Sequence, residues 1–373
     1  MARMFGTDGI RGVANVDLTA DLAFKVGQCG AYVLTRNTYN RPRIIIGKDT
    51  RKSGDMLEAA LTAGMCSVGA KVIPLGVIQT PAVAYLTRKY KADAGVVVSA
   101  SNKSMEYNGI KFFDKYGYKL SGDTEREIEE YILGERETGE LPLGAELGKV
   151  SRVDTGKRDY VDFIKSTAAT DFEGLRIAID CANGAAYECA KLVFKELGAD
   201  VTLINNVPTG ININDHCGSA DIAGLQKFVT ENKYHMGLVF DGDADRIVAV
   251  DEKGTLFDGD MIMLICALEM KNSGRLAKNT VVSTAASSDA FFGALDDNGI
   301  LYEKTDDSYR FVLDNMLRGG FNLGGDKSGY IIFLDHNSNG DGILTAVQLT
   351  HALKASGKSM SELVASASEG RQG

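Results

Sequence analysis

The stretch Asp241-Gly242-Asp243-Ala244-Asp245 follows an apolar run and carries three carboxylates at alternate positions. The small residues between them let the loop turn tightly, so the three side chains can converge on one hard divalent cation. Oxygen ligands of this kind suit Mg²⁺. Without an ion, three negative charges this close would repel one another. The spacing therefore predicts a magnesium site, and a solvated acidic turn is the alternative.

Two stretches of the sequence imitate a calcium-binding EF-hand loop, and both lack a residue that such a loop needs. In the first, Arg246 stands at the sixth position, which requires glycine, and 247–250 continue as a strand. The second begins at Asp335 and has Ala346 at the twelfth position, where a bidentate carboxylate is required. We expect the second stretch to be a polar loop that leads into a helix over 342–353.

Ser101 ends the segment Val98-Ser99-Ala100-Ser101, at the carboxyl end of a predicted strand. Ligands collect at strand ends in open α/β sheets, so a serine there is well placed to react. No Gly-x-Ser-x-Gly elbow surrounds it, which argues against a hydrolase triad. Because strand ends often carry serine, an ordinary structural serine stays open as the alternative.

Two glycine-rich stretches could hold an anion or a sugar. The first, 5–12, contains Arg11, and the second, 324–329, contains Gly325, Asp326 and Ser328. Neither fits the eight-residue P-loop pattern, which argues against nucleotide binding of that type. Glycine loops mostly serve turns, so each motif is weak by itself.

The elements that must position these residues alternate between short β-branched runs and helical patterns. This order predicts an α/β fold with three tandem domains of similar topology and mixed, mostly parallel sheets. We expect the domains at 1–150, 151–253 and 254–373, with a linker over 134–152. The predicted strands are 43–47, 71–75, 95–99, 175–180, 200–204, 236–240, 246–251, 280–283 and 319–323, and helices are predicted over 55–68, 184–197 and near 291–295.

Composition argues against a nucleic-acid-binding, membrane-inserted or secreted protein. The net charge of −9 argues against nucleic acid as a partner, although local basic groups can still hold a small phosphorylated ligand. No apolar run is long enough to span a bilayer, and the start of the chain lacks a secretory apolar region, so we expect a cytoplasmic protein without membrane insertion. The six cysteines form no Cys-x-x-Cys pair, which favours reduced thiols over a zinc site.

Taken in order, these segments resemble the α-phosphohexomutases, and bacterial phosphoglucosamine mutases in particular. The likeness runs from Met4 to about Leu363. It also rests on segments outside the loops above, namely 107–113, 180–184, 212–219 and 340–342.

The resemblance implies a phosphosugar substrate and the interconversion of glucosamine 6-phosphate and glucosamine 1-phosphate. It implies a phosphorylated Ser101, and one Mg²⁺ ion held by Ser101 and the three aspartates. Arg11, Lys111 and Arg246 are then catalytic residues, whereas Gly325, Asp326 and Ser328 contact the sugar. Amino-sugar synthesis for the cell wall is the implied pathway.

The chain departs from this family in its loops. Asn102 stands where the family has a histidine and cannot act as an acid or base. A fourth, phosphate-binding domain is expected to be absent. One alternative is therefore an impaired mutase body that regulates another protein, with a diadenylate cyclase as the partner. Phosphomannomutase or phosphoglucomutase specificity is the other alternative, and a homodimer is left open.

Overall fold

The computed structural model describes residues 4–6, 8–37 and 41–368, with the side chains up to residue 365. The chain divides into two compact units. The first unit comprises Met1–Tyr160 with Pro208–Ile213, and the second comprises Val161–Val207 with Asn214–Gly373.

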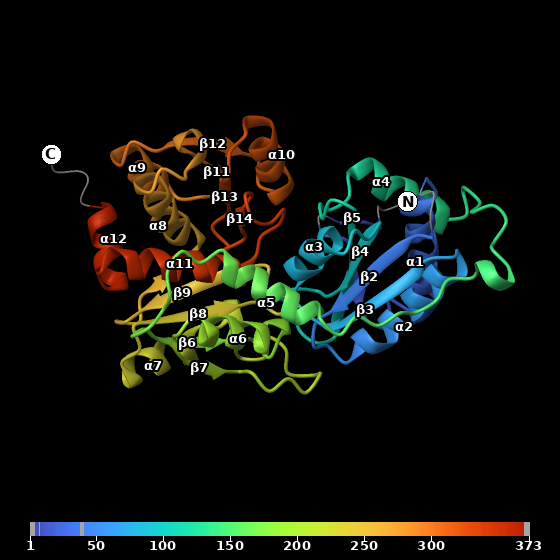
Figure 1. Ribbon diagram of the computed structural model, residues 1–373, viewed down its shortest axis with the longest axis horizontal. Coiled ribbons are helices and arrows are strands. Elements are labelled where there is room, and N and C mark those ends of the chain that lie inside the picture. The colour runs from blue at the N-terminus through green and yellow to red at the C-terminus, as the bar shows by residue number, and fades with distance from the viewer. Residues whose placement is uncertain (1–3, 7, 38–40, 369–373) are drawn as a thin grey trace. The chain divides into compact units, whose positions relative to one another are not determined.

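The first unit contains a five-stranded sheet with the order β1-β5-β4-β2-β3 (Figure 1). Strands β3 and β4 run parallel to β2, β5 is antiparallel to β4, and β1 is antiparallel to β5. The strands are β1 (Ile10–Val13), β2 (Arg43–Lys48), β3 (Lys71–Val77), β4 (Ala94–Val98) and β5 (Tyr107–Asp114), and the helices are α1 (Ala20–Thr35), α2 (Ser53–Ser67), α3 (Thr80–Lys89) and α4 (Gly122–Ile132).

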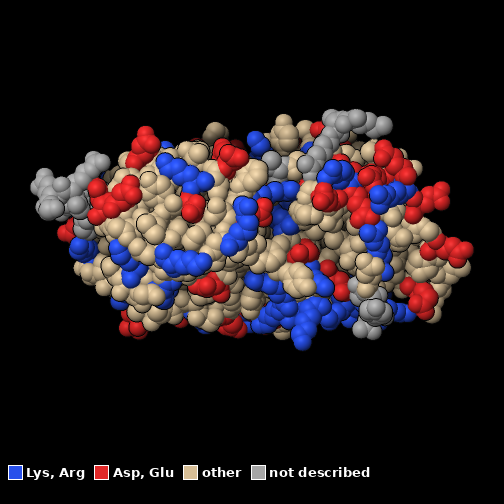
Figure 2. Space-filling model, turned by 90° about the horizontal axis from the view of Figure 1, so that it is seen from above, with Lys and Arg blue, Asp and Glu red and all other residues tan. Residues whose placement is uncertain are grey.

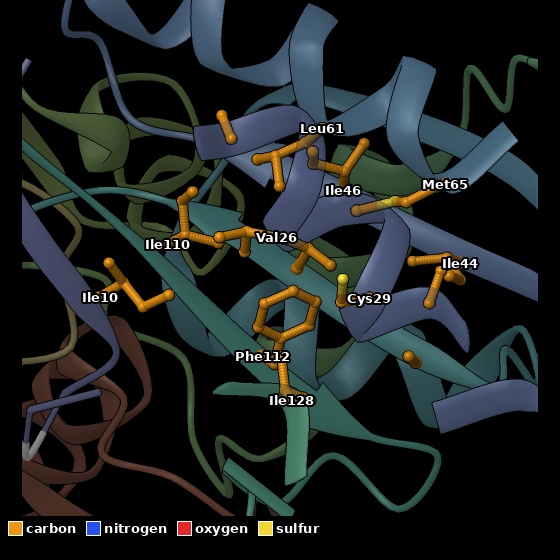
Figure 3. Close-up of a cluster of buried hydrophobic side chains, with 14 of the residues drawn as sticks. Ile10, Val26, Cys29, Ile44, Ile46, Leu61, Met65, Ile110, Phe112 and Ile128 are labelled. Atoms are coloured by element: carbon orange, nitrogen blue, oxygen red, sulfur yellow. The ribbon is translucent and has the colours of Figure 1, made fainter. Parts of the chain in front are cut away.

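Alternation along β2 buries both faces of this sheet. Ile44 and Ile46 point into a core that α1, α2 and α4 complete (Figure 3). On the other face, Gly47 leaves room for Val83 of α3. The central parallel strands β2 and β4 are therefore buried along most of their length, as expected for parallel strands with helices on both faces.

The first sheet of the second unit has the order β10-β9-β8-β6-β7, again with parallel pairing around its first strand, β6. Helix α7 packs on β6 and β8, and α6 packs on β7. The elements are α5 (Gly156–Ser166), whose last residues belong to this unit, β6 (Arg176–Asp180), α6 (Cys189–Glu196), β7 (Asp200–Ile204), α7 (Ala223–Asn232), β8 (Met236–Phe240), β9 (Ile247–Asp251) and β10 (Leu256–Phe257).

The second sheet of this unit has the order β12-β11-β13-β14, with only β14 antiparallel to its neighbour. Helices α8 and α10 pack on β13, and α11 packs on α8 and also on β9 of the preceding sheet. The elements are α8 (Gly259–Asn272), β11 (Thr280–Thr284), α9 (Asp289–Asp297), β12 (Leu301–Thr305), α10 (Tyr309–Gly319), β13 (Leu323–Gly325), β14 (Ile331–Phe333), α11 (Gly342–Ser356) and α12 (Met360–Ser368).

The three sheets share one strand order. In β3-β2-β4-β5, β7-β6-β8-β9 and β12-β11-β13-β14, the second and third strands of the motif lie on either side of the first. This repetition confirms the predicted fold of three α/β domains with mixed sheets. Such an order creates a switch point at the first strand, because the second strand is added on one side of it and the third strand on its other side.

Two predicted elements differ from the structure. Residues 184–197 are not one α-helix, because a separate 3₁₀ turn at Ala185–Tyr187 precedes α6, which begins only at Cys189. Residues 319–323 do not form a strand, because α10 extends to Gly319 and ends at Gly320, whose φ is 68°. The left-handed conformation suits glycine at a helix C-terminus, so strand β13 starts only at Leu323.

The predicted linker is largely irregular, but it is tied to the sheet of the first unit. It contains a short 3₁₀ turn at Gly144–Glu146. Near its end, the Val72 N–H of β3 donates to the Lys149 carbonyl at 3.0 Å. The segment therefore extends the edge of this sheet for one bridge.

The distribution of surface charge and the state of the cysteines agree with what the composition predicts. Both signs of charge occur across the face shown in Figure 2. No helix among the described residues combines the length and the apolar character that a membrane span requires.

All six cysteines are free, as predicted. Burial, reinforced by the Asp180 and Asp215 charges, raises the pKa of Cys217 to about 12, so this thiol stays protonated near neutral pH.

Close contact between α1 and α2 depends on small residues. A Cβ on Gly64 would lie 2.1 Å from the Phe24 carbonyl oxygen, and one on Gly27 would lie 2.4 Å from the Leu61 carbonyl oxygen. We predict that Gly64→Ala lowers the free energy of unfolding by about 1–3 kcal/mol, because the helices must separate. Urea denaturation measures this change.

The matched control is Gly224→Ala on the exposed face of α7, where a Cβ would meet nothing within 4 Å. This change should leave stability unaltered or raise it by up to about 1 kcal/mol, since alanine is the better helix former. Equal stability of the two variants would contradict the packing argument.

Candidate active site

Three of the candidate loops follow the same strand of the repeated motif. Ser101 follows β4, the aspartate loop follows β8, and Asp326 follows β13. These are the third strands of their sheets, next to the switch point where ligands bind in open α/β sheets. Three motifs that are weak when taken one at a time thus occupy equivalent positions.

The three aspartates of the loop after β8 come together. Asp241, Asp243 and Asp245 are buried, and one carboxylate oxygen of each lies within 4.8 Å of the other two. This is the one such group of potential metal ligands among the residues that the structure describes. Three buried carboxylates at this separation repel one another, and a hard divalent cation would remove that repulsion. The donor set therefore fits Mg²⁺, and the alternative of a solvated acidic turn is wrong.

Neighbouring backbone holds this loop in shape. Ala244 has a φ of 54°, and its carbonyl accepts from the Gly342 N–H at 2.9 Å. On another side, the Ala185 N–H donates to the Gly242 carbonyl at 2.8 Å. A Cβ on Gly184 would lie 2.4 Å from the same carbonyl oxygen, so this position needs glycine. The loop geometry therefore depends on the turn after β6 and on the start of α11.

Arg246 lies directly beside the aspartates. Its backbone N–H donates to Asp241 Oδ1 at 3.3 Å, and its Nε is 3.9 Å from Asp245 Oδ1. The side chain is about one-third exposed, so the guanidinium borders the acidic group while keeping access to solvent. It is placed to contact an anion near the loop.

Ser101 is buried in a backbone conformation that is rare for serine. Its exposed fraction is 2% and its φ is 52°. By contrast, residues 102–104, which follow it, are exposed. Ser101 belongs to the first unit and the aspartates to the second, so the prediction that Ser101 also ligates the metal stays a prediction.

A cluster of cations surrounds Asp8. Lys111 Nζ lies 2.9 Å from one oxygen of Asp8, Lys119 Nζ lies 2.7 Å from the other, and Arg11 also pairs with this carboxylate. Lys111 is only 1% exposed. Burial alone would raise the pKa of Asp8, but the charges of Lys111, Lys119 and Arg11 outweigh it and lower that pKa. Three cations gathered around one carboxylate form a group that suits phosphate.

The loop after β13 brings Asp326 and Ser328 together. The Ser328 N–H donates to Asp326 Oδ1 at 2.8 Å, and the Ser328 hydroxyl donates to the same oxygen. Gly329, with a φ of 89°, packs against Ile247, where a Cβ would lie 1.8 Å from the carbonyl oxygen. The Gly325 carbonyl accepts from Ser283 Oγ at 3.1 Å, so that oxygen has a protein partner.

Several polar residues behind these loops escaped the sequence reasoning. Asp260, for example, accepts from Ser287 Oγ at 2.6 Å and from the Ser288 N–H at 2.8 Å, next to the strand that holds Gly325. Lys119, Asp49 and Arg51 were also missed. What distinguishes these residues is that their charges are buried, and a sequence does not display burial. For Asp49 and Arg51, the position just after a predicted strand was the one signal in the sequence.

The second stretch that imitates a calcium loop, which begins at Asp335, instead caps the N-terminus of helix α11. Asp341 is buried, its Oδ1 accepts from the Leu344 N–H at 3.1 Å, and its Oδ2 accepts from Asn337 Nδ2 at 3.0 Å. It is therefore an N-cap. The predicted loop before a helix is confirmed, although its Asn337, Ser338 and Asn339 are buried rather than solvated.

We predict that Asp8→Asn destabilises the protein by roughly 3 kcal/mol at pH 7, because it leaves buried cations without their anion. The folded pKa of Asp8 lies below the unfolded value of about 3.9. Its stabilising effect is therefore complete well above pH 4 and is lost as the pH falls toward the folded pKa. The difference from the original chain should shrink in acid, which urea denaturation at pH 7 and pH 3 measures.

Asp55→Asn is the control, since this carboxylate pairs with Lys48 but its side chain is 83% exposed. An exposed ion pair contributes little, so stability should hardly change. A loss in Asp8→Asn that is no larger than in Asp55→Asn would contradict the buried-cluster interpretation.

Comparison with known families agrees with the repeated strand order. Residues 2–139 match the phosphoglucomutase/phosphomannomutase alpha/beta/alpha domain I, 158–254 match domain II and 258–369 match domain III. The solved structure of a phosphoglucomutase/phosphomannomutase family protein from Burkholderia thailandensis has a TM-score of 0.86 at 22% identity, covering 97% of this chain and 79% of that one.

A second structure, N-acetylphosphoglucosamine mutase from Aspergillus fumigatus in complex with GlcNAc-6P and magnesium, has a TM-score of 0.65 at 15% identity, covering 97% of this chain and 79% of that one. At such identities, these two likenesses concern the fold alone.

Curated relatives are much more similar in sequence. Phosphoglucosamine mutase from Acetivibrio thermocellus is 56% identical over 363 residues, which cover 97% of this chain and 81% of the relative. The phosphoglucosamine mutase from Clostridium acetobutylicum is 54% identical with the same coverage. With these identities and three matching domains in sequence order, the chain belongs to the phosphoglucosamine mutase family.

Proposed function

We propose that this chain is an intramolecular phosphotransferase that interconverts glucosamine 6-phosphate and glucosamine 1-phosphate through a phosphoserine at Ser101 and a bisphosphate intermediate. The observation that carries this proposal is the buried group of three aspartates in a chain 56% identical to a phosphoglucosamine mutase. We place the enzyme in the cytoplasm, in amino-sugar synthesis.

Asp241, Asp243 and Asp245 would hold one Mg²⁺ ion. The ion, when bound, would stabilise negative charge on a transferring phosphoryl group. The protein's own contribution is to keep three carboxylates converged and out of water through the turn after β6 and the start of α11. Arg246 adds a positive charge beside Asp245.

Ser101 would carry the phosphoryl group, and the cation cluster of the same unit would hold phosphate oxygens. Lys111 and Arg11 supply the positive charge, and Asp8 keeps their ammonium and guanidinium groups close together. Phosphoryl transfer depends mainly on position and charge stabilisation, so rigid placement of these groups is the main requirement.

The loop after β13 would contact the sugar. The Asp326 carboxylate can accept hydrogen bonds from hydroxyl or ammonium groups, and Ser328 can both donate and accept. Gly325 would let the substrate approach the backbone. We propose that these three groups belong to three domains, with the limits 1–150 for Ser101, 151–253 for the aspartate loop and 254–373 for the sugar-binding loop.

The proposal is tested by incubating the chain with Mg²⁺, a catalytic amount of glucosamine 1,6-bisphosphate and each of three substrates. These are the 6-phosphates of glucosamine, mannose and glucose, and phosphorus NMR follows the 1-phosphate products. We expect the glucosamine substrate to turn over fastest. Faster turnover of mannose or glucose phosphate would assign another specificity, and no turnover of any of them would contradict a mutase.

We predict that Ser101→Ala abolishes turnover, because the variant lacks the hydroxyl that would carry the phosphoryl group. Intact-mass spectrometry after incubation with the bisphosphate should show a phosphate adduct on the original chain and none on this variant. Ser104→Ala, which changes an exposed serine of the same loop, should retain the adduct. An adduct that persists in Ser101→Ala would place the phosphate elsewhere.

Removal of a metal ligand should have opposite effects with and without metal. We predict that Asp243→Asn weakens Mg²⁺ binding by about tenfold or more, because the site loses a charged ligand. In the presence of EDTA, the same variant should be more stable than the original chain, because one source of buried repulsion is gone.

Calorimetric titration with Mg²⁺ and thermal denaturation measure these two effects. Asp215→Asn is the control, since Asp215 is an exposed carboxylate of the same unit. Unchanged Mg²⁺ affinity in Asp243→Asn would exclude this loop as the metal site.

A further inference from the structure

A fully buried ion pair lies under the Ser101 loop and has no part in the function proposed above. The side chains of Asp49 and Arg51 are both 0% exposed, and they pair with each other. Burying two charges is costly unless their remaining hydrogen-bonding groups are used. The contacts of this pair therefore indicate what it holds.

Arg51 holds carbonyl groups on both sides of the serine turn. One guanidinium nitrogen, Nη2, lies 3.2 Å from the Ser101 carbonyl oxygen and also donates to the Lys103 carbonyl. The other, Nη1, pairs with Asp49. A planar guanidinium can serve these partners at once, which an ammonium group cannot do with the same geometry.

Asp49 holds the other side of Ser101 through Ser99. Ser99 Oγ donates to Asp49 Oδ2 at 2.5 Å and accepts from the Ser101 N–H at 3.0 Å. Both backbone groups of Ser101, its N–H and its carbonyl, are thus connected to the same ion pair.

Strand pairing explains why these residues meet. Lys48 at the end of β2 stands opposite Val98 at the end of β4, so the next residues, Asp49 and Ser99, leave the sheet side by side. The Asp49 N–H also donates to the Val98 carbonyl at 3.1 Å. The network of Asp49, Arg51 and Ser99, called the clamp below, therefore lies at the switch point itself.

We propose that Arg51, directly, and Asp49, through Ser99, are positioning residues that hold Ser101 in its left-handed conformation for phosphoryl transfer. Serine disfavours this conformation, so the loop needs external support to keep it. This inference rests on the proposed function, because it assigns Ser101 as the group to be positioned.

The first test measures phosphorylation of Ser101 by glucosamine 1,6-bisphosphate in Ser99→Ala and Arg51→Lys. In this step the Ser101 oxygen bonds to phosphorus, the bond from phosphorus to the sugar oxygen breaks, and the serine proton ends on that sugar oxygen. We expect both variants to react about tenfold more slowly or worse, because a misplaced nucleophile loses its effective concentration. The KM for the monophosphate should stay within about twofold, since substrate binding is not affected.

The control is Arg36→Gln, which removes an arginine of the same unit that pairs with Glu127, remote from the serine loop in sequence. It should phosphorylate at the original rate. Ser99→Thr restores the hydroxyl and should recover most of the rate lost in Ser99→Ala, whereas a purely structural defect would not follow the hydroxyl. If Arg51→Lys does not fold, the comparison of Ser99→Ala with Ser99→Thr still tests the proposal.

A second readout does not need activity. Amide hydrogen exchange in the peptide that covers residues 99–104 should be faster in Ser99→Ala and Asp49→Asn than in the original chain or in Arg36→Gln. Unchanged exchange in both variants would overturn the clamp. If the original chain accepts no phosphate while the variants still exchange faster, the clamp holds and the proposed function fails.

Discussion

Parallel pairing between the first and third strands of each sheet fixes where the loops with Ser101, the three aspartates and Asp326 begin. Val98, Val239 and Gly325 each stand beside the end of the first strand of their own sheet, opposite Lys48, Asp180 and Ser283. Polar groups at the end of the first strand therefore lie next to the loop that follows the third strand. The chemistry of each loop depends on this register, since a shift by one residue would turn its side chains to the other face of the sheet.

The same principle recurs with different residues in the three sheets. Asp49 supports Ser101 through Ser99, and Ser283 donates to the Gly325 carbonyl. Asp180 accepts from the Ala182 N–H at 2.8 Å in the turn that packs against the aspartate loop. Buried polar partners of this kind make the loops rigid, because a buried group that lost its partner would be left without compensation. Rigid loops in turn suit a reaction that depends on position and charge.

Buried charge has opposite consequences in the two kinds of site. Around Asp8, three cations share one carboxylate, an arrangement that suits a phosphate as the ligand. In the aspartate loop, three carboxylates repel one another and favour a cation. The two sites therefore gather charges of opposite sign, and each suits a ligand of the other sign.

The sequence by itself determined the fold class, most strands and the location of the aspartate loop, because apolar periodicity and the spacing of carboxylates are local properties of the chain. It misjudged 184–197, where a 3₁₀ turn precedes α6, and 319–323, where Gly320 takes positive φ, because local residue patterns do not show where the backbone must turn. Only the tertiary structure decided that Asp49 and Arg51 lie under Ser101 and that Lys119 joins Lys111 at Asp8. Residues 50 or more positions apart meet there through strand pairing, and a sequence does not state which distant side chains share one buried space.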